Sequence, residues 1–250
     1  MPMISAVSWS AGPTSAPVIP KTYHNPGTAP NEGSSYFDGT NDYLEVADNT
    51  SLALGTGDFT IECWVYFSFT SLSGGSNRRI FRLHNAGNAV DNLQILVDNG
   101  SLWNNKAGDL NLYSNTFLGT LNTDIRFGWH HIAVVRNSGT LDFYLDGVSK
   151  SSESNTQDYS PGGASGPAPM IGATGSHLGD YQGNISNLRM VKGTAVYTNN
   201  FTVPTAPLTD ITNTQLLTCQ NNTGAITDAS SNSHVINAFG NVQASNSNPF

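Results

Sequence analysis

Residues 58–67 alternate apolar and other side chains one by one, which is the pattern of a β-strand. The odd positions are all apolar and are expected to face a core: Phe59, Ile61, Cys63, Val65 and Phe67. The even positions are mixed, as on a face that meets solvent or a ligand: Thr60, Glu62, Trp64 and Tyr66. Because no amphipathic helix of convincing length occurs in the sequence, segments of this kind restrict the chain to an all-β fold.

Tight turns separate further apolar segments of the same kind. Residues 93–98 lead through Asn99-Gly100 into residues 101–103, and Asn-Gly supplies the two positive-φ positions of a type I′ hairpin turn. Residues 131–145 form a second hairpin pattern that turns at Asn137-Ser138-Gly139, and Asp146-Gly147 predicts another type I′ turn after it. Successive hairpins indicate antiparallel pairing, so the sequence predicts an antiparallel β-sandwich jelly roll.

The first 30 residues have a different texture from the rest. They contain six prolines, which remove backbone donors and fix φ: Pro2, Pro13, Pro17, Pro20, Pro26 and Pro30. We therefore expect residues 1–30 to be an extended arm that serves as a docking segment, and residues 31–250 to form one jelly roll whose C-terminal strands complete the sandwich. A chain of 250 residues is long enough to bury such a core.

Charge excludes one class of partner. The formal net charge is −8, only ten residues are Lys or Arg, and the one tight basic pair is Arg78-Arg79. Nucleic-acid binding requires clustered cations, so a nucleic-acid partner is not expected. No apolar stretch is long enough for a membrane helix, and the N-terminus lacks the basic and apolar regions of a secretory signal.

The two cysteines, Cys63 and Cys219, lie far apart and inside apolar segments. This placement favours two buried free thiols, with a long-range disulfide as the alternative.

The order of five segments resembles the laminin-G-like group of the concanavalin A-like lectin/glucanase superfamily. They are residues 37–46 (FDGTNDYLEV), 58–65 (DFTIECWV), 129–136 (WHHIAVVR), 141–147 (LDFYLDG) and 183–190 (GNISNLRM). The resemblance covers about residues 34–192 and implies a concanavalin A/laminin-G-like jelly roll.

The C-terminal part adds a narrower resemblance. Residues 191–204 (VKGTAVYTNNFTVP), residues 214–220 (TQLLTCQ) and the closing Asn248-Pro249-Phe250 are similar to virion proteins of tailed bacteriophages, cyanophages especially. This implies a capsid spike, decoration or tail-fibre component that is made in the host cytoplasm and displayed on the particle surface. Its expected partners are other virion proteins, contacted through the arm or the C-terminal segment, and a cell-surface glycan. A homotrimer is expected only by analogy with spikes and fibres.

Catalysis is not expected. Retaining glycoside hydrolysis needs two carboxylates about 5–5.5 Å apart, which a strand would supply at positions i and i+2. The four glutamates have no acidic residue two positions away: Glu32, Glu45, Glu62 and Glu153. The adjacent His130 and His131 would point to opposite faces of a strand and could not chelate one zinc ion.

Two binding sites remain as hypotheses. The resemblance implies that a calcium ion can lie between loops, as in many relatives. Candidate Ca²⁺ ligands are Asp38 and Asp42 in the early turn and Asp180 just before a late strand, although such residues are also ordinary turn formers. Trp64, Trp103 and Tyr181 are candidates for stacking on a sugar, although tryptophan in a sandwich often packs in the core.

The favoured function is a non-enzymatic phage surface protein; the alternatives are a soluble carbohydrate-binding module and, third, a glycoside hydrolase.

Overall fold

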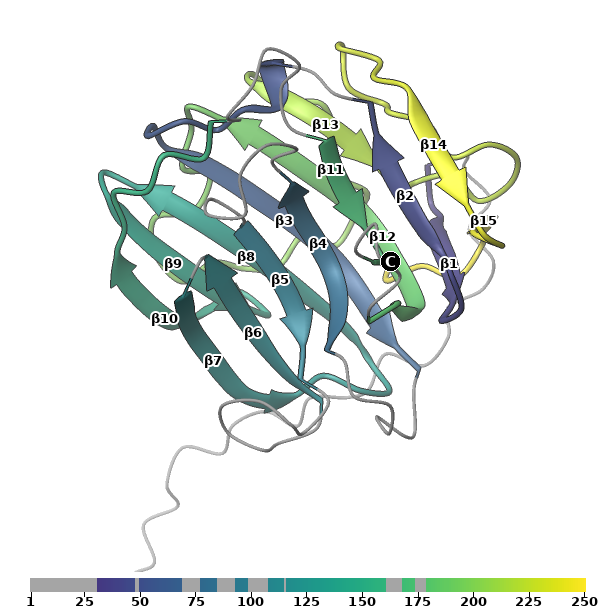
Figure 1. Ribbon diagram of the computed structural model, residues 1–250, viewed down its shortest axis with the longest axis horizontal. Coiled ribbons are helices and arrows are strands. Elements are labelled where there is room, and N and C mark those ends of the chain that lie inside the picture. The colour runs from purple at the N-terminus through teal and green to yellow at the C-terminus, as the bar shows by residue number, and fades with distance from the viewer. Residues whose placement is uncertain are drawn as a thin grey trace, which may run out of the picture.

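The chain folds as a sandwich of two antiparallel β-sheets (Figure 1). The computed structural model describes residues 31–47, 50–68, 77–84, 93–98, 108–114, 116–160, 168–173 and 179–250. Within these ranges the only helical element is one 3₁₀ turn, η1 (Thr50–Leu52). No helix in the described part of the chain is long and apolar enough to cross a membrane. The expected all-β sandwich is therefore confirmed.

Among the described residues the two sheets have eight and seven strands. Sheet A has the order β10-β9-β8-β3-β12-β1-β15, and β13 pairs with β12 as well. Sheet B has the order β14-β2-β11-β4-β5-β6-β7. The strands of sheet A are β1 (Ser34–Asp38), β3 (Phe59–Phe67), β8 (Trp129–Asn137), β9 (Thr140–Leu145), β10 (Val148–Ser154), β12 (Gln182–Lys192), β13 (Thr214–Thr218) and β15 (Gln243–Ser245). Those of sheet B are β2 (Tyr43–Val46), β4 (Arg78–His84), β5 (Leu93–Val97), β6 (Asp109–Ser114), β7 (Thr116–Asp124), β11 (Ala168–Ile171) and β14 (Ile236–Phe239).

Strand β3 shows why the alternation matters. Its odd positions, Phe59 to Phe67, are all fully buried in the main core between the sheets, as the sequence predicts. The even positions were expected to meet solvent or a ligand, and for three of the four this is wrong, because Thr60, Glu62 and Trp64 are buried as well. The outer face of sheet A must therefore be covered by another part of the chain.

Residues 193–211, here called the covering segment, lie over Thr60 and Glu62, and the C-terminal Phe250 packs on Trp64. The segment is anchored to β3, where Thr60 Oγ1 donates to the Thr194 carbonyl (3.0 Å) and accepts from the Val196 amide (2.9 Å). At the far side of the sheet the Phe201 amide donates to the Gly147 carbonyl (2.9 Å) in the β9–β10 turn. Three side chains of the segment pack on sheet A and form a second, small apolar cluster with it. The cluster consists of Ala133, Val135 and Tyr144 from the sheet and Ala195, Tyr197 and Phe201 from the segment. The outer face of sheet A thus has a hydrophobic contact layer of its own.

Two of the three predicted turns are in place. Ser138 and Gly139 (φ 50° and 81°) join β8 to β9, and Asp146 and Gly147 (φ 50° and 77°) join β9 to β10. The type I′ turn predicted at Asn99-Gly100 falls on residues outside the described ones; next to them the Asp98 amide donates to the Asp109 carbonyl, and β5 pairs with β6. The connection therefore spans residues 99–107, which lie outside the described residues, as does the expected arm of residues 1–30.

The two cysteines are free and fully buried, as predicted. Burial raises the pKa of the Cys219 thiol to about 12 and raises the pKa of the Cys63 thiol well above its ordinary value. Both therefore act as small apolar residues of the main core.

Candidate functional site

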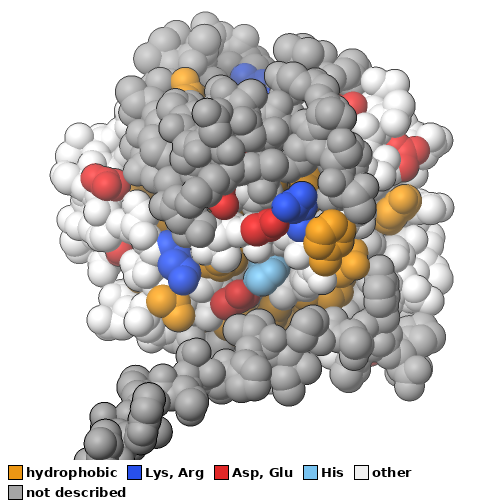
Figure 2. Space-filling model, turned by 90° about the horizontal axis from the view of Figure 1, so that it is seen from below, with side chains coloured by type: hydrophobic (Ala, Val, Ile, Leu, Met, Phe, Trp, Pro, Cys, Tyr) orange, Lys and Arg blue, Asp and Glu red, His pale blue; other side chains and the backbone are white. Residues whose placement is uncertain are grey.

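One end of the sandwich carries a group of charged and histidine side chains beside the exposed Phe127. The group lies where β7 passes into β8, next to the β9–β10 turn. It consists of Asp124, Arg126, Phe127, His130 and Asp146, and we call it the rim cluster. Figure 2 views this end of the molecule and shows acidic, basic, histidine and hydrophobic side chains close together.

An ion pair forms the first half of the rim cluster. The Arg126 guanidinium donates from Nε to both carboxylate oxygens of Asp124 (2.9 and 3.0 Å) and from Nη2 to Oδ2 (2.5 Å). The Arg126 amide also donates to Asp124 Oδ1 (3.0 Å). The hydrogen bond from the Arg126 side chain is the main cause that holds the pKa of Asp124 below its ordinary value. Asp124 is therefore a fixed, ionised acceptor, whose side chain is 47% exposed.

Phe127 is the most unusual residue of the rim cluster. Its backbone has a φ of 64°, in the left-handed region that bulky residues rarely adopt. Its amide donates to the Phe67 carbonyl (3.0 Å) at the end of β3, which fixes this conformation. The residue is nevertheless 52% exposed, and the Arg126 guanidinium lies 5.7 Å from the ring centroid. A strained backbone thus holds an aromatic ring out toward solvent.

A histidine–aspartate pair completes the rim cluster. His130 Nδ1 lies 2.8 Å from Asp146 Oδ2, and the other oxygen of Asp146 accepts the His131 amide (2.9 Å). The positive φ of Asp146 in its turn places the carboxylate over the start of β8. The charge of His130 also contributes to lowering the pKa of Asp124, so the two halves of the cluster interact electrostatically.

The rim cluster therefore combines an apolar ring face with fixed hydrogen-bonding groups. The carboxylates of Asp124 and Asp146 accept hydrogen bonds, and the guanidinium of Arg126 donates them. Binding sites for small polar molecules have this composition, with an apolar surface and a few polar groups that set orientation.

The three predicted calcium ligands lie near one another, at the β1–β2 turn. The Asp42 carboxylate accepts the Asp38 and Asn241 amides (2.6 and 2.5 Å), and Asp180 Oδ2 accepts the Asn41 amide (2.7 Å). Asp42 is fully buried, and burial is the main reason that its pKa is raised.

These bonds give the aspartates a structural role in the turn. In the described part of the chain, no group of three or more His, Cys, Asp or Glu side chains has the arrangement needed to hold a metal ion. Calcium binding stays a prediction.

The predicted sugar-stacking residues are not placed as expected. Tyr181 is fully buried in the main core, edge-on to Phe37 with ring centroids 5.9 Å apart. Trp64 is buried on the outer face of sheet A, where Phe250 packs edge-on against it at 6.0 Å. Neither ring offers a face to a ligand, so the expected exposure of these two residues is wrong. Trp103 lies outside the described residues.

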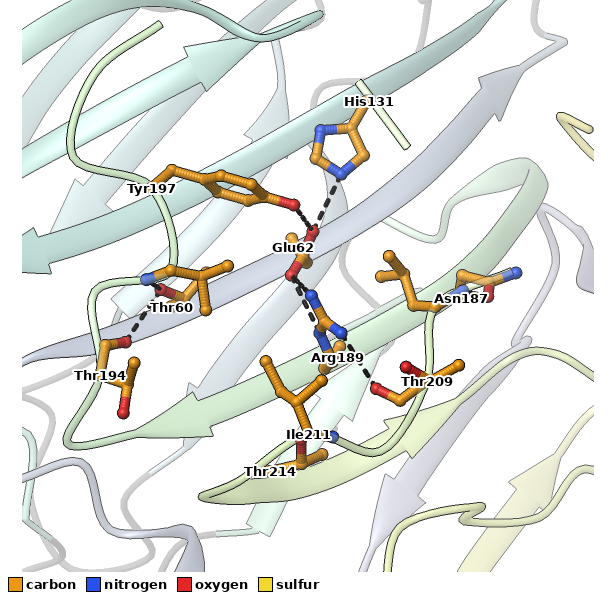
Figure 3. Close-up of polar contacts among 12 residues, drawn as sticks. Thr60, Glu62, His131, Asn187, Arg189, Thr194, Tyr197, Thr209, Ile211 and Thr214 are labelled. Atoms are coloured by element: carbon orange, nitrogen blue, oxygen red, sulfur yellow. Dashed lines mark hydrogen bonds and ion pairs between the residues drawn. The ribbon is translucent and has the colours of Figure 1, made fainter. Parts of the chain in front are cut away.

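Glu62 is the acidic residue nearest the middle of sheet A, and it is sealed beneath the covering segment (Figure 3). It accepts hydrogen bonds from Arg189 Nε and Nη2 (3.0 and 2.6 Å), from His131 Nε2 (3.1 Å) and from the Tyr197 hydroxyl (2.8 Å). The Glu62 side chain is fully buried and that of Arg189 is 6% exposed. This network joins three strands and the covering segment, and its carboxylate has no access to a substrate.

No sequence signal pointed to the rim cluster as a site. Asp146 was recognised only as a turn residue and His130 only as a strand residue. The positive φ of Phe127 depends on the amide bond to Phe67, which is 60 residues away in the chain. A local pattern carries no information about such a contact.

Sequence comparison places the chain in a known group. The model of the concanavalin A-like lectin/glucanases superfamily in the laminin G class matches residues 38–196, which is more than half of the chain. The chain belongs to this superfamily. A comparison with curated proteins finds no match.

Three solved structures are similar to the chain at low identity, one of them with a TM-score above 0.5. A Bacteroides ovatus protein, provisionally assigned as carbohydrate binding, has a TM-score of 0.56 and 14% identity over 85% of this chain. The match covers 59% of that protein, so the present chain spans about three fifths of its length. Domain 4 of an extracellular arabinanase from Geobacillus stearothermophilus has a TM-score of 0.47 and 19% identity, covering 65% of this chain and 72% of that one. Domains LG4-5 of mouse laminin alpha1 have a TM-score of 0.43 and 13% identity, covering 70% and 47%.

Proposed function

We propose that this chain is a lectin-like carbohydrate-binding module without catalytic activity, and that the rim cluster is its binding site. The observation that carries the proposal is the exposed ring of Phe127, held between the Asp124–Arg126 ion pair and the carboxylate of Asp146. A pyranose has one face of C–H groups, which packs on an aromatic ring, and a rim of hydroxyls, which hydrogen-bond to carboxylates and guanidinium groups.

The backbone of Phe127 supports a binding role over a packing role. A bulky residue in the left-handed region costs about 1–3 kcal/mol, and such residues cluster at ligand sites. Glycine or asparagine would fit the same backbone at lower cost. Because more than half of the Phe127 residue is exposed, core packing does not explain the aromatic side chain.

The chemistry of two carboxylates, Asp124 in the rim cluster and Glu62 in sheet A, supports a non-enzymatic role. A glycosidase needs one carboxyl group that keeps its proton near neutral pH. The pKa of Asp124 is lowered, chiefly by its hydrogen bond with Arg126, and the pKa of the buried Glu62 is lowered too. Both carboxylates are therefore poor proton donors, and each is already bound by an arginine.

The family and the fold agree with this proposal. The superfamily includes lectins, and the Bacteroides ovatus protein with the same fold is provisionally assigned to carbohydrate binding.

A glycan array followed by titration calorimetry tests the proposal. We expect the purified chain to bind at least one oligosaccharide, and Phe127→Ala to lower the affinity at least tenfold. Phe239→Ala is the matched control, because Phe239 is also exposed (38%) but stacks on Tyr43 in another part of the molecule. Equal affinity of wild type and Phe127→Ala, or no glycan binding at all, would refute the rim as a sugar site.

We further propose that the module is displayed on the surface of a phage particle. The support is the similarity of residues 191–204 and 214–220 to phage virion proteins. Phe250 at the C-terminal end packs on Trp64 of sheet A, so the proposal assigns docking to residues 1–30. Mass spectrometry of purified virions tests this placement, and absence of the chain from the particles would contradict it.

A further inference from the structure

Strand β14 is the outermost strand of sheet B, at the edge opposite to β7 (Figure 1). Among the described strands it pairs only with β2. The Ala47 amide donates to the Val235 carbonyl (3.0 Å), and in an antiparallel ladder the direction of the backbone groups alternates along the strand. The amides and carbonyls of Ile236 and Ala238 therefore point away from β2, and such a row can pair with a further strand.

The surface along this edge is apolar and open to solvent. Val235 is 63% exposed and Phe239 is 38% exposed, and both lie on the face of β14 opposite to Ile236, which packs on the main core. The Phe239 ring stacks on Tyr43 of β2, with centroids 4.4 Å apart and an angle of 6° between the planes, so its position is fixed. Four large apolar side chains are exposed in the described part of the chain, and two of them are therefore at this one short strand.

An edge strand of sheet A shows how this protein blocks such pairing elsewhere. Strand β10 carries the exposed Lys150 and Glu153, and its register with β9 is irregular between Ser149 and Ser151. Charged side chains and bulges keep an edge from accepting another strand. Strand β14 has neither device, because its register with β2 is regular and residues 229–250 contain no Asp, Glu, Lys or Arg.

Strand β14 is also complementary to itself. If two β14 strands pair antiparallel with Asn237 at the centre, Ile236 of each copy lies opposite Ala238 of the other, and their free backbone groups exchange hydrogen bonds. The same register places Val235 of each copy opposite Phe239 of the other, so that exposed apolar side chains meet. Asn237 lies opposite its own counterpart, and no like charges meet although the chain has a net charge of −8.

We infer that β14 pairs antiparallel with β14 of a second copy of this chain and joins the two copies of sheet B across a two-fold axis at Asn237. The partner is a second copy because the register that uses the free backbone groups is symmetric and matches each exposed apolar side chain with another. The contact is short, so we expect a dimer that dissociates on dilution. A two-fold contact gives an even number of copies, in contrast to the homotrimer expected by analogy.

The inference does not depend on the proposed function. The rim cluster follows β7, which is at the other edge of sheet B, so the contact leaves it uncovered. Calorimetry measures sugar affinity per site, which this pairing does not change. Loss of the dimer and loss of sugar binding are therefore separate results.

Sedimentation velocity of the full-length chain over a wide range of concentrations tests for the dimer. We expect the wild type to change from monomer to dimer as its concentration rises. A monomer at every concentration, or a trimer, would overturn the inference.

Charge at the centre of the contact tests the register. Asn237→Lys and Asn237→Asp each place like charges opposite one another, so each should raise the dissociation constant of the dimer about fivefold or more. An equal mixture of the two variants should dimerise more tightly than either alone, because opposite charges then meet. Ser152→Lys on the exposed edge β10 is the control and should dimerise like the wild type. Melting temperatures near that of the wild type show that the variants fold, and a dissociation constant that ignores the charge at this position would refute the register.

Cross-linking gives an independent result. The two copies of Asn237 would form a non-hydrogen-bonded pair with Cα atoms ~4.5 Å apart, within the range of about 4.4–6.8 Å that a disulfide spans. Asn237→Cys should therefore form a covalent dimer under mild oxidation, and Ser152→Cys should not; Cys63 and Cys219 are buried and do not compete. Equal cross-linking of the two variants would contradict the inference. If the chain stays monomeric and Asn237→Cys is protected from a thiol reagent, another segment such as residues 1–30 covers β14, and the inference fails.

Discussion

Replacement of Glu62 by glutamine is the most direct test of how the covering segment is held. The carboxylate is fully buried and accepts four hydrogen bonds, two of them from the buried Arg189. Glutamine keeps the shape but removes the charge, and its NH₂ group faces donors. Arg189 would then be a buried cation without a counter-ion.

The expected cost follows from this geometry. Breaking a buried ion pair by removing one charge costs about 3–5 kcal/mol. This is a large part of the ~5–15 kcal/mol by which domains are stable. Tyr197→Phe removes one hydrogen bond to the carboxylate but keeps the ring that stacks on Phe201, so its expected cost is about 1.5–3 kcal/mol.

Urea unfolding followed by tryptophan fluorescence measures both effects. Trp64 is a suitable reporter, because it packs edge-on against His131 with ring centroids 5.2 Å apart. Glu153→Gln is the control, since Glu153 is exposed on β10 and its loss should cost less than about 0.5 kcal/mol. A Glu62→Gln variant as stable as Glu153→Gln would refute the reasoning.

The pH dependence gives a second test of Glu62. Burial by itself would raise the pKa of Glu62, but the hydrogen bond from His131 and the charge of Arg189 outweigh it and lower the pKa from 4.5. The unfolded chain therefore takes up the Glu62 proton at higher pH than the folded protein. The stabilisation by Glu62 should be complete above about pH 4.5 and should be lost as the pH falls through the lower folded pKa. The stability difference between wild type and Glu62→Gln should shrink in that range, and a constant difference down to pH 2 would contradict this.

Three further predictions concern the rim, the thiols and the calcium hypothesis. Phe127→Gly should raise the free energy of unfolding by about 1 kcal/mol while glycan binding is lost, because glycine adopts φ 64° without strain; a destabilised variant in a urea titration would contradict this. Cys63 and Cys219 should not react with a thiol reagent in the native protein and should both react in urea, since burial raises the pKa of both thiols; rapid native labelling would contradict their core position. If Asp38, Asp42 and Asp180 bind calcium, a chelator should lower the melting temperature and added Ca²⁺ should restore it, whereas identical melting curves would exclude a stabilising calcium site.

Much of the sandwich could be predicted from the sequence because strand formation is encoded locally. The alternation in residues 59–67 identifies the core face of β3, and the turn residues Ser138-Gly139 and Asp146-Gly147 identify two hairpins. The strand that pairs with β5 could not be read from Asn99-Gly100, because an Asn-Gly pair permits a type I′ turn but does not enforce one. Pairing of Asp98 with Asp109 decided the register there.

The candidate sites could not be predicted in the same way. Trp64 and Tyr181 have aromatic rings with a polar group, which occur both in cores and at surfaces. Both lie on or beside strands that carry apolar and polar residues on one face, so the sequence could not show whether another part of the chain would cover that face. Residues 193–211 bury Thr60 and Glu62 through contacts that span more than 130 positions in the chain. Arg189 reaches Glu62 only because a bulge at Asn187 (φ 54°) shifts the alternation of β12.

The sequence by itself determined the fold class, the superfamily and the core face of β3, because side-chain periodicity and turn chemistry act between near neighbours. Three features depended on the tertiary structure. They are the burial of the outer face of sheet A by the covering segment, the pairing of Glu62 with Arg189, and the exposure of the Phe127 ring. Each of these depends on a contact between segments distant in sequence. The physical reason is that burial, desolvation of charge and a strained φ are properties of surroundings, and those surroundings exist only once the two sheets and the covering segment have come together.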